Sequence, residues 1–421
     1  SRVARLACMR LHRAWLVAIA TMLTLIGASA FRSTTSVLYM PIEMDFGWTR
    51  SITSGAVALN ILVYGLTAPF AAVIMARFGA KRVALSALAL IASGTLLTVV
   101  MHNAWELYLD WGILVGVGTG CLALVFAAQV ASTWFVKRRG LVTGIFSASY
   151  ATGQLIFLPA ITQVTNDAGW RTATLIVAVF CLALIPVFAL LFKAAPGPGE
   201  APYGGTAADV APKPPVTVRA NVAAMRSALR MPAFWALALT FFVCGWTTNG
   251  LIGAHFIPAA HDHGMPTTMA AGLLAIVGIF DFIGTIASGW LTDRFDPAWL
   301  LVAYYGLRGL ALFTVPFVLG PTVEPPMLFF IVFYGLDWIA TVPPTVELCR
   351  RYFGLDNAGL IYGWVFASHM VGASMASAFA GWIRDFDGDY FIAWIVAAVL
   401  CIAASAYSLT MRKSAGLAPA R

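Results

Sequence analysis

The chain has 421 residues, of which 60% are hydrophobic and 10% are charged, with a mean hydropathy of +0.84. Soluble domains are about half apolar and one quarter charged, so this composition excludes an ordinary soluble enzyme. The sparse charge and the aromatic fraction of 13% also exclude a disordered chain. We therefore expect most of the chain to lie in a lipid bilayer.

Continuous apolar runs without a period of two predict spanning helices rather than a barrel. Twelve helices would leave about 35 of the 421 residues for each helix and its connection, and a spanning helix needs about 20 to 25. The expected spans lie at roughly 14–40, 51–76, 81–101, 104–132, 140–164, 171–193, 232–260, 267–291, 298–320, 325–349, 357–382 and 389–411. The first run follows four arginines, as a secretory signal does, but its length predicts a retained helix.

The distribution of Lys and Arg predicts the orientation of the helices. One set of connections carries 21 of the 26 basic residues and the opposite set carries three. The remaining two, Arg32 and Arg308, lie inside apolar runs. We expect both termini on the cytoplasmic side of a bacterial inner membrane. Topology then accounts for the net charge of +8, and no nucleic-acid partner is expected.

Residues 194–220 contain six Pro and four Gly in 27 positions, a composition typical of a flexible linker. We expect an N-terminal six-helix bundle over 1–193, a cytoplasmic linker over 194–231 and a C-terminal six-helix bundle over 232–421. Arginines among apolar residues in 219–231 predict a short amphipathic helix on the inner membrane surface.

The two halves are similar to each other in sequence. ARFGAKRVAL after the second span matches LTDRFDPAWLL after the eighth, with Arg77 and Arg294 separated by 217 positions. VKRRGLVTG after the fourth span matches RRYFGLDNAGLIYG after the tenth, with Gly144 and Gly363 separated by 219 positions. Two matches at nearly one offset predict a parallel six-helix repeat and transport by alternating access.

These loops resemble the signature of the major facilitator superfamily, a Gly followed by Asp-Arg and then by Gly and basic residues. The first loop has Ala76 at the acidic position, and the second has Asp296 at the glycine position. The resemblance implies an all-α membrane fold of twelve helices in two six-helix bundles. It also implies a charged cytoplasmic gate, formed here by Arg77, Asp293 and Arg294.

Three stretches are similar to the bacterial monocarboxylate-transporter and oxalate/formate-exchanger branch of that superfamily. They are MDFGWTRSITS at 44–54, WFVKRRGLVTGIFSASYATGQLIFLPAI at 134–161 and YFGLDNAGLIYGWVFASHMVGASMASAFAGWIRDFDGDY at 352–390. The resemblance implies a small organic anion as substrate. The branch has an Asp and, four residues later, an Arg on its eighth helix. Here Asp281 fits the first position and Thr285 stands at the second, while Arg32 in AFRSTTS resembles a bacterial subset.

Charged groups in a spanning helix cost several kcal/mol unless paired or hydrated, so they are candidates for function. Arg32 lies about seven residues before Tyr39, roughly 10 Å below the expected outer interface. Its side chain either reaches the outer headgroups or faces a water-filled cavity, where a guanidinium can grip a carboxylate. Ser29 and Ser36 share its helix face, which favours the cavity.

Arg308 lies near the middle of its span and needs an anion nearby. The candidate partners are Asp281 and Asp337 on the eighth and tenth helices. The pair is either a permanent ion pair that fixes helix packing or a switchable one, in which release of the Arg lets the Asp take a proton. A switchable pair would couple anion uptake to proton entry, with Arg308 as a further substrate contact.

Uncharged polar residues in the spans are either substrate contacts or hydrogen-bonded links between helices. The candidates are Asn60, Tyr64, Tyr150, Gln154 and Asn249. His369 in the eleventh span is either a titrating group or a neutral packing residue. Glycines at 112, 116, 118 and 120 predict close helix packing, and Pro343-Pro344 predicts a break in the tenth helix.

Several classes of function are not expected. The chain lacks a Walker lysine motif, GxSxG, HExxH and paired cysteines, so we expect no enzymatic centre, no metal and no cofactor. The sequence predicts a monomeric secondary transporter that carries a small organic anion together with protons. An organic-anion exchanger, a proton-driven efflux pump and a membrane-embedded sensor or scaffold remain alternatives.

Overall fold

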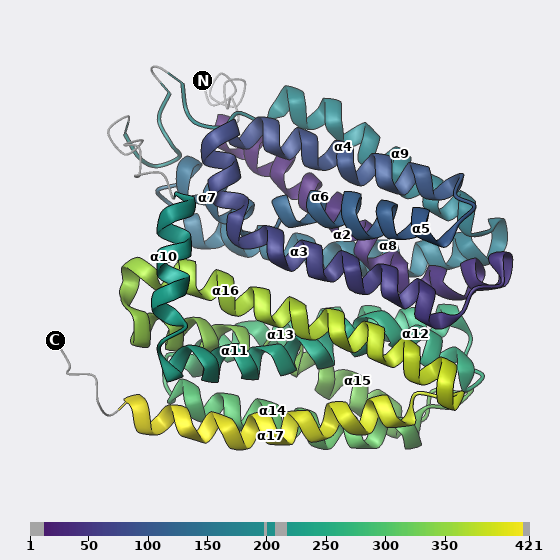
Figure 1. Cartoon of the computed structure of the whole chain (residues 1–421). Coiled ribbons are helices and arrows are strands. Elements are labelled where there is room, and N and C mark those ends of the chain that lie inside the picture. Colours follow the sequence, from purple (N-terminus) through teal and green to yellow (C-terminus); the bar gives the residue numbers. More distant parts are fainter. Residues whose placement is uncertain (1–11, 198–199, 207–216, 416–421) are drawn as a thin grey trace, which may run out of the picture.

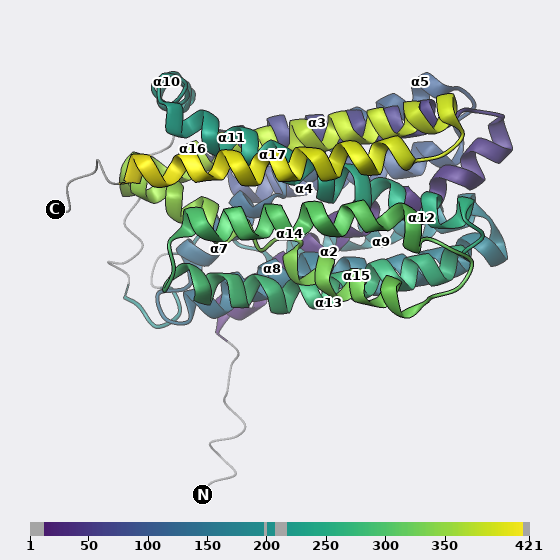
Figure 2. The ribbon, with the colours of Figure 1, turned by 90° about the horizontal axis from the view of Figure 1, so that it is seen from below.

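The structure, a computed structural model, describes residues 12–197, 200–206 and 217–415. These residues form helices and their connections, with one isolated β-bridge between Phe135 and Tyr203. The long helices run nearly side by side in two bundles, the first built before the linker and the second after it (Figure 1). The view from below shows the same lengthwise arrangement (Figure 2).

The first bundle is built from the helices that precede the linker. They are α2 (Arg13–Phe46), α3 (Arg50–Phe78), α4 (Ala80–Val99), a composite helix, α8 (Arg139–Ala168) and α9 (Trp170–Leu191). The composite helix joins α5 (Ala104–Leu107), a π-helical segment at Tyr108–Val115, α6 (Gly116–Cys121) and α7 (Leu124–Trp134).

The second bundle follows the short helix α10 (Val218–Ala228). It begins with α11 (Pro232–Gly245), a π-helical segment at Trp246–Ile252 and α12 (Gly253–Asp262), which form one crossing. The others are α13 (Thr267–Thr292), α14 (Pro297–Val318), α15 (Pro325–Asp337), α16 (Val342–Asp387) and α17 (Phe391–Ala415). Proline opens three of these helices because the first helical position needs no N–H donor.

The helix α16 contains parts of two crossings. Gly354 interrupts it with φ +74°, a left-handed conformation that glycine adopts without steric cost. Residues before Gly354 complete the crossing begun by α15, and those after it form the next. Counted in this way, the described residues contain twelve crossings, of which ten are apolar and long enough to span a membrane by composition alone. The predicted all-α fold in two six-helix bundles is confirmed.

The bundles meet through three pairs of helices. They are α3 with α16, α8 with α13 and α2 with α12. Each bundle also has its own cluster of buried apolar side chains. The interface between the bundles is therefore formed by a few long helices, which can hold a site between them.

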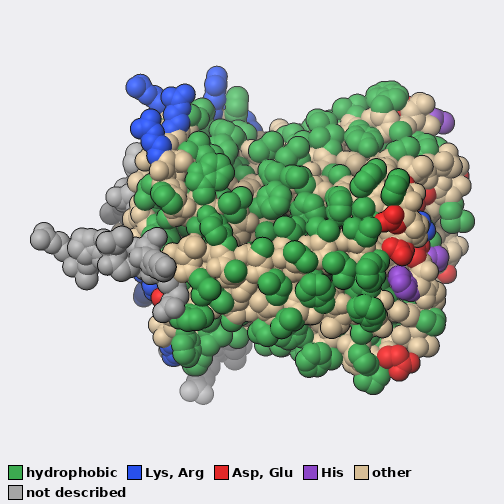
Figure 3. All heavy atoms as spheres, turned by 60° about the horizontal axis from the view of Figure 1, so that its bottom comes forward, with side chains coloured by type: hydrophobic (Ala, Val, Ile, Leu, Met, Phe, Trp, Pro, Cys, Tyr) green, Lys and Arg blue, Asp and Glu red, His purple; other side chains and the backbone are tan. Residues whose placement is uncertain are grey.

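Charge differs between the two ends of the molecule. We call the end at which α2 and α8 begin the linker end, and the opposite end the far end. Figure 3 shows Lys and Arg gathered at one end and Asp, Glu and His at the other, with apolar side chains over the surface between them. An apolar belt between two polar ends is the surface that a bilayer requires.

The first helix is longer than predicted. It continues past residue 40 to Phe46, where buried Ile42 and the ion pair of Glu43 with Arg50 hold its last turns. Arg32 is therefore 14 residues, roughly 21 Å, from the last residue of α2.

Part of the predicted linker is held against the first bundle. The N–H of Tyr203 donates to the carbonyl of Trp134 at 2.8 Å, and its ring packs edge-on against Trp15. The structure thus differs from the prediction of flexible chain at 200–206. The amphipathic helix predicted over 219–231 is present as α10.

The predicted close packing by glycines is confirmed in the fourth crossing. A β-carbon at Gly118 would lie 2.7 Å from the carbonyl oxygen of Ala87 on α4. By contrast, a β-carbon at Gly272 on α13 would meet nothing within 4 Å. The two positions therefore form a matched pair for testing helix packing.

We expect Gly118→Ala to lower the free energy of unfolding by about 1–3 kcal/mol, because the added methyl group must force α4 away. Gly272→Ala should be neutral or slightly stabilising, since alanine favours a helix. Unfolding of the purified proteins in detergent with a chemical denaturant measures both. Equal effects of the two substitutions would contradict the packing described for α6 against α4.

Candidate functional site

A cavity of about 450 Å³ lies between the two bundles. Both bundles line it, through α2, α3 and α8 on one side and α11, α13 and α16 on the other. It extends toward the linker end, where Gly144 lies near the start of α8 and Ile286 near the end of α13. Its size is that of a small-molecule site.

Most of the cavity wall is apolar. Its aromatic members are Tyr64, Phe146, Phe241, Phe282, Trp338, Tyr362 and Phe366. Such a wall can bury the carbon skeleton of a ligand but offers few polar contacts. Recognition of a polar group must therefore come from the few polar side chains among them.

Arg32 is the only Lys or Arg among the described residues that line the cavity. Its guanidinium carbon lies 4.4 Å from the centroid of the Tyr64 ring, a cation–π contact that holds the side chain at the wall. Arg32 also lines a smaller adjoining pocket of about 30 Å³ together with Asn60 and Asn249. Four residues predicted as substrate contacts thus come together.

The two asparagines differ in what already binds them. The Asn60 amide donates to the carbonyl of Trp111 at 2.6 Å, so it links two helices of the first bundle. The Asn249 Nδ2 lies 3.1 Å from Nε2 of His369. Asn249 lies in the π-helical segment Trp246–Ile252, a wider turn that recurs at functional sites. His369, which contacts Asn249, also lines the cavity.

Asp281 is the acidic residue of the cavity wall. Its Oδ1 accepts hydrogen bonds from the N–H of Ile339 at 3.0 Å and from the hydroxyl of Thr285 at 3.2 Å. Thr285, which stands where the resembled branch has an arginine, thus donates a hydrogen bond to Asp281.

Arg308 lies outside the set of residues that line the cavity, and its side chain is 0% exposed. Of the two candidate partners, the structure pairs it with Asp337, since its Nε donates to Asp337 Oδ2 at 2.5 Å. Its Nη1 donates to Cys244 Sγ at 3.1 Å and to Thr247 Oγ1 at 3.3 Å. Arg308 therefore belongs to a buried ion pair with Asp337 and not to the cavity wall.

Both Arg308 and Asp281 hold the break in the tenth crossing. The helix α15 ends at Asp337, and α16 begins at Val342 with prolines in its first turn. Arg308 Nη2 donates to the carbonyl of Asp337 at 2.6 Å, and Asp281 accepts from Ile339. Backbone groups freed inside a membrane protein need such partners.

The predicted cytoplasmic gate residues lie at the linker end. The guanidinium carbon of Arg77 lies 5.4 Å from the centroid of the Phe78 ring, and that of Arg294 lies 4.1 Å from the centroid of the Trp290 ring. Arg294 also donates a hydrogen bond to the carbonyl of Trp290. Asp293 follows the last residue of α13. The contacts described for Arg77 and Arg294 are with the helix ends beside them, Phe78 of α3 and Trp290 of α13, and none of the described contacts joins them across the bundles. Tyr150 and Gln154 lie on α8, and their side chains are outside the described part.

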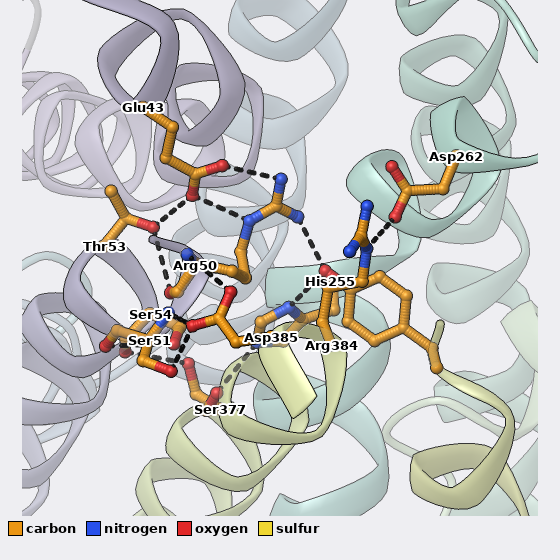
Figure 4. A network of polar contacts seen from close by, with 11 residues as sticks. Glu43, Arg50, Ser51, Thr53, Ser54, His255, Asp262, Ser377, Arg384 and Asp385 are labelled. Atoms are coloured by element: carbon orange, nitrogen blue, oxygen red, sulfur yellow. Dashed lines mark hydrogen bonds and ion pairs between the residues drawn. The ribbon is translucent and has the colours of Figure 1, made fainter. Parts of the chain in front are cut away.

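A polar network at the far end was missed as a candidate site. It joins Glu43 and Arg50 of the first bundle to Asp385, Tyr390 and His255 of the second (Figure 4). The sequence signal was present, because the network draws on two of the stretches noted above, 44–54 and 352–390. The count of Lys and Arg treated Arg50 only as a loop charge, since its partners in the second bundle are more than 330 positions away.

Comparisons with known proteins agree on one family. A sequence model of the Major Facilitator Superfamily matches residues 17–377. An uncharacterized MFS-type transporter of Bacillus subtilis, YcxA, is 23% identical over 393 residues, covering 90% of each protein. Human monocarboxylate transporter 11 is 27% identical over 365 residues, covering 83% of this chain and 72% of that protein.

Other similar proteins extend this result. Bovine monocarboxylate transporter 13 is 26% identical over 382 residues, with 89% of this chain and 84% of that protein covered. The crystal structure of a bacterial homologue of the human lysosomal transporter Spinster aligns over 98% of this chain and 100% of that one. The TM-score is 0.72 at 16% sequence identity, so this likeness concerns the fold.

We expect Arg308→Leu to lower the free energy of unfolding by about 3–5 kcal/mol, because it leaves Asp337 without its buried partner. The double variant Arg308→Leu/Asp337→Leu should be more stable than Arg308→Leu alone, since both charges are then removed. Denaturant unfolding of the purified proteins measures the difference. A double variant that loses the sum of the two single effects would show that the two residues act independently.

Proposed function

Because the chain belongs to the major facilitator superfamily, we propose its specific activity from the cavity that the two bundles share. The chain is a membrane transporter and not an enzyme. We propose that it is a secondary active transporter that moves a small organic anion with one carboxylate by alternating access, together with protons. One chain supplies both sides of the cavity, so the proposed transport unit is the monomer.

The position of Arg32 carries this proposal. A guanidinium at the wall of an otherwise apolar cavity can bind a carboxylate through two parallel hydrogen bonds. The aromatic side chains around it can cover the apolar part of the same ligand. Asp281 in the same wall would repel a second carboxylate, which favours monocarboxylates over dicarboxylates. The similarity to monocarboxylate transporters 11 and 13 supports the same class.

The distribution of charge supports a cytoplasmic position for the linker end. Basic residues such as Lys81, in the first turn of α4, and Arg138, before α8, lie at this end, whereas Glu43, Asp45 and Asp262 lie at the far end. Positive loops remain on the cytoplasmic side during membrane insertion. We therefore assign the linker end to the cytoplasm and the far end to the outside of a bacterial inner membrane.

Proton coupling is assigned to Asp281 or Asp337. Asp281 lies at the cavity wall, where a ligand and water can reach it, and it supports the broken tenth crossing through Ile339. Asp337 supports the same break through Arg308. Protonation of either carboxyl weakens its bonds at the break, so proton binding and helix movement would be linked.

A proton-driven exporter of lipophilic compounds is the second candidate, because most of the cavity wall is apolar. Such an exporter does not need a carboxylate contact and should tolerate the loss of Arg32. An anion exchanger, by contrast, needs Arg32 but does not need a proton. The two predictions below therefore separate all three functions.

We expect Arg32→Gln to weaken monocarboxylate binding by about 10- to 150-fold, the loss of one charged hydrogen-bonding partner worth about 1.5–3 kcal/mol. A thermal-shift screen of mono- and dicarboxylates identifies the ligand, and calorimetry then measures its affinity. Arg171→Gln is the matched control, because Arg171 forms a surface pair with Asp45 at the far end. Unchanged affinity in Arg32→Gln would rule out this anion site.

We expect Asp281→Asn or Asp337→Asn to remove the dependence of uptake on an inward proton gradient, while exchange of labelled for unlabelled anion continues. Uptake into liposomes at several outside pH values, with and without a gradient, measures both activities. A wild-type protein that exchanges anions but ignores the gradient is an exchanger. If both variants retain the wild-type pH dependence, neither residue carries the proton.

A further inference from the structure

The far end of the interface is closed by a network that begins with an ion pair. Arg50 of α3 donates to both carboxylate oxygens of Glu43 on α2, with Nε–Oε1 at 2.7 Å and Nη2–Oε2 at 2.8 Å. Its Nη1 donates to the hydroxyl of Tyr390 in the second bundle at 2.6 Å. Figure 4 shows Arg50 between Glu43 and the second bundle. One guanidinium thus joins both bundles.

The start of α3 is capped by the other bundle. Asp385 Oδ1 accepts from the N–H of Arg50 at 3.0 Å, and its Oδ2 accepts from the N–H of Ser51 at 2.7 Å and from the Ser51 hydroxyl. The residue before the helix, Thr49, makes no side-chain cap of its own. A carboxylate at a helix N-terminus satisfies free N–H groups and opposes the helix dipole. Asp385 therefore stabilises α3 only while the bundles are together.

Next to this cap, α16 and α3 lie in direct contact. The hydroxyl of Ser377 on α16 donates to the carbonyl of Ser54 on α3 at 3.3 Å. A β-carbon at Gly381 would overlap the Ser54 hydroxyl, so the two helices touch at this glycine. We call these far-end contacts of Glu43, Arg50, Ser51, Ser54, His255, Ser377, Gly381, Asp385 and Tyr390 the far-end gate.

His255 of α12 lies at the centre of the far-end gate, and its side chain is 0% exposed. Its Nε2 lies 2.9 Å from the carbonyl of Ser377, which can only accept, so Nε2 carries the hydrogen. Its Nδ1 lies 3.3 Å from the hydroxyl of Tyr390. Because Tyr390 accepts from Arg50, its own hydrogen is available for Nδ1. These contacts satisfy both ring nitrogens of a neutral imidazole.

We propose that His255 is a proton-binding site of the far-end gate: the gate closes on the neutral imidazole and opens when His255 is protonated. A hydrogen on Nδ1 would meet the Tyr390 hydrogen, which must then turn away. It would also place a second positive charge beside Arg50 in a site closed to water. The protonated form is therefore stable only when the bundles separate and water enters.

The groups that face His255 do not offset this charge. From α2, the Tyr39 ring lies 5.6 Å from the imidazole, and Glu43 beyond it is bound bidentately to Arg50. From α16, Asp385 is bound to the start of α3, and Arg384 forms an ion pair with Asp262 of α12 at 2.6 Å. The nearby acids are thus each held by another donor.

The proposal predicts a definite response to pH. An imidazole in contact with water titrates near pH 6.5. If only the open gate binds the proton, lowering the pH from about 7.5 to about 5.5 raises the ratio of open to closed gate about tenfold. This role is separate from the proton carried with the solute, and it depends neither on the identity of the solute nor on Arg32.

Electron–electron distance measurements between two spin labels test the proposal. Met44→Cys and Phe386→Cys place the labels on opposite bundles, at positions that are 81% and 76% exposed. The five cysteines within the described residues are buried, and Cys8→Ser removes the sixth. The labelled full-length protein is studied in lipid nanodiscs at pH 7.5 and 5.5. Arg50→Ala, which removes both the Glu43 and the Tyr390 contact, marks the distance of the open gate.

We expect acid to raise the ratio of long to short distances about tenfold, and His255→Gln to remove this response. Glutamine keeps one donor and one acceptor without a titrating group. His263→Gln, at the far end but outside the network, should respond as the parent protein does. The same distances at both pH values would overturn the proposal. An acid response retained in His255→Gln would also overturn it and assign the response to Glu43 or Asp385.

Discussion

The second bundle is organised around one buried positive charge. Lipid and packed side chains offer no water to Arg308, so its donors must find partners within the protein. Asp337 supplies the opposite charge, and the carbonyls freed where α15 ends accept two further bonds. The proline-broken crossing and the buried arginine therefore require each other. The same break exposes the N–H of Ile339, which donates to Asp281 at the cavity wall.

At the far end, too, a charged side chain binds the free backbone groups of a helix end. There the free N–H groups at the start of α3 belong to one bundle and the carboxylate of Asp385 to the other. When such a contact opens, water can take the place of each partner, because the site lies at the end of the helices. Opening therefore costs far less than breaking the pair at Arg308. A gate held by replaceable bonds suits the proposed alternation between two states.

Much of the fold could be predicted because lipid imposes a simple rule on sequence. Apolar runs and the Lys/Arg count indicated the helices, and repeated loops indicated the two bundles. Arg32, Tyr64 and Asn249 were predicted separately, as polar residues inside the spans, and the structure brings them together. The partner of Arg308 and the links of Arg50 did not follow, because they depend on side-chain positions across three or more helices. The length of the first helix was underestimated, because α2 continues to Phe46 past the predicted end of the span.

The two arginines inside the spans show why position alone does not indicate function. Arg308 has a carboxylate, two carbonyls, a thiol and a hydroxyl within hydrogen-bonding distance, so a ligand would have to displace a complete set of partners. Arg32 lies against the face of Tyr64, at the wall of a cavity shared by both bundles. A cation–π contact holds a guanidinium through its face, and a guanidinium binds a carboxylate through its edge. The same residue type thus forms a buried ion pair in one bundle and is the proposed solute contact in the other.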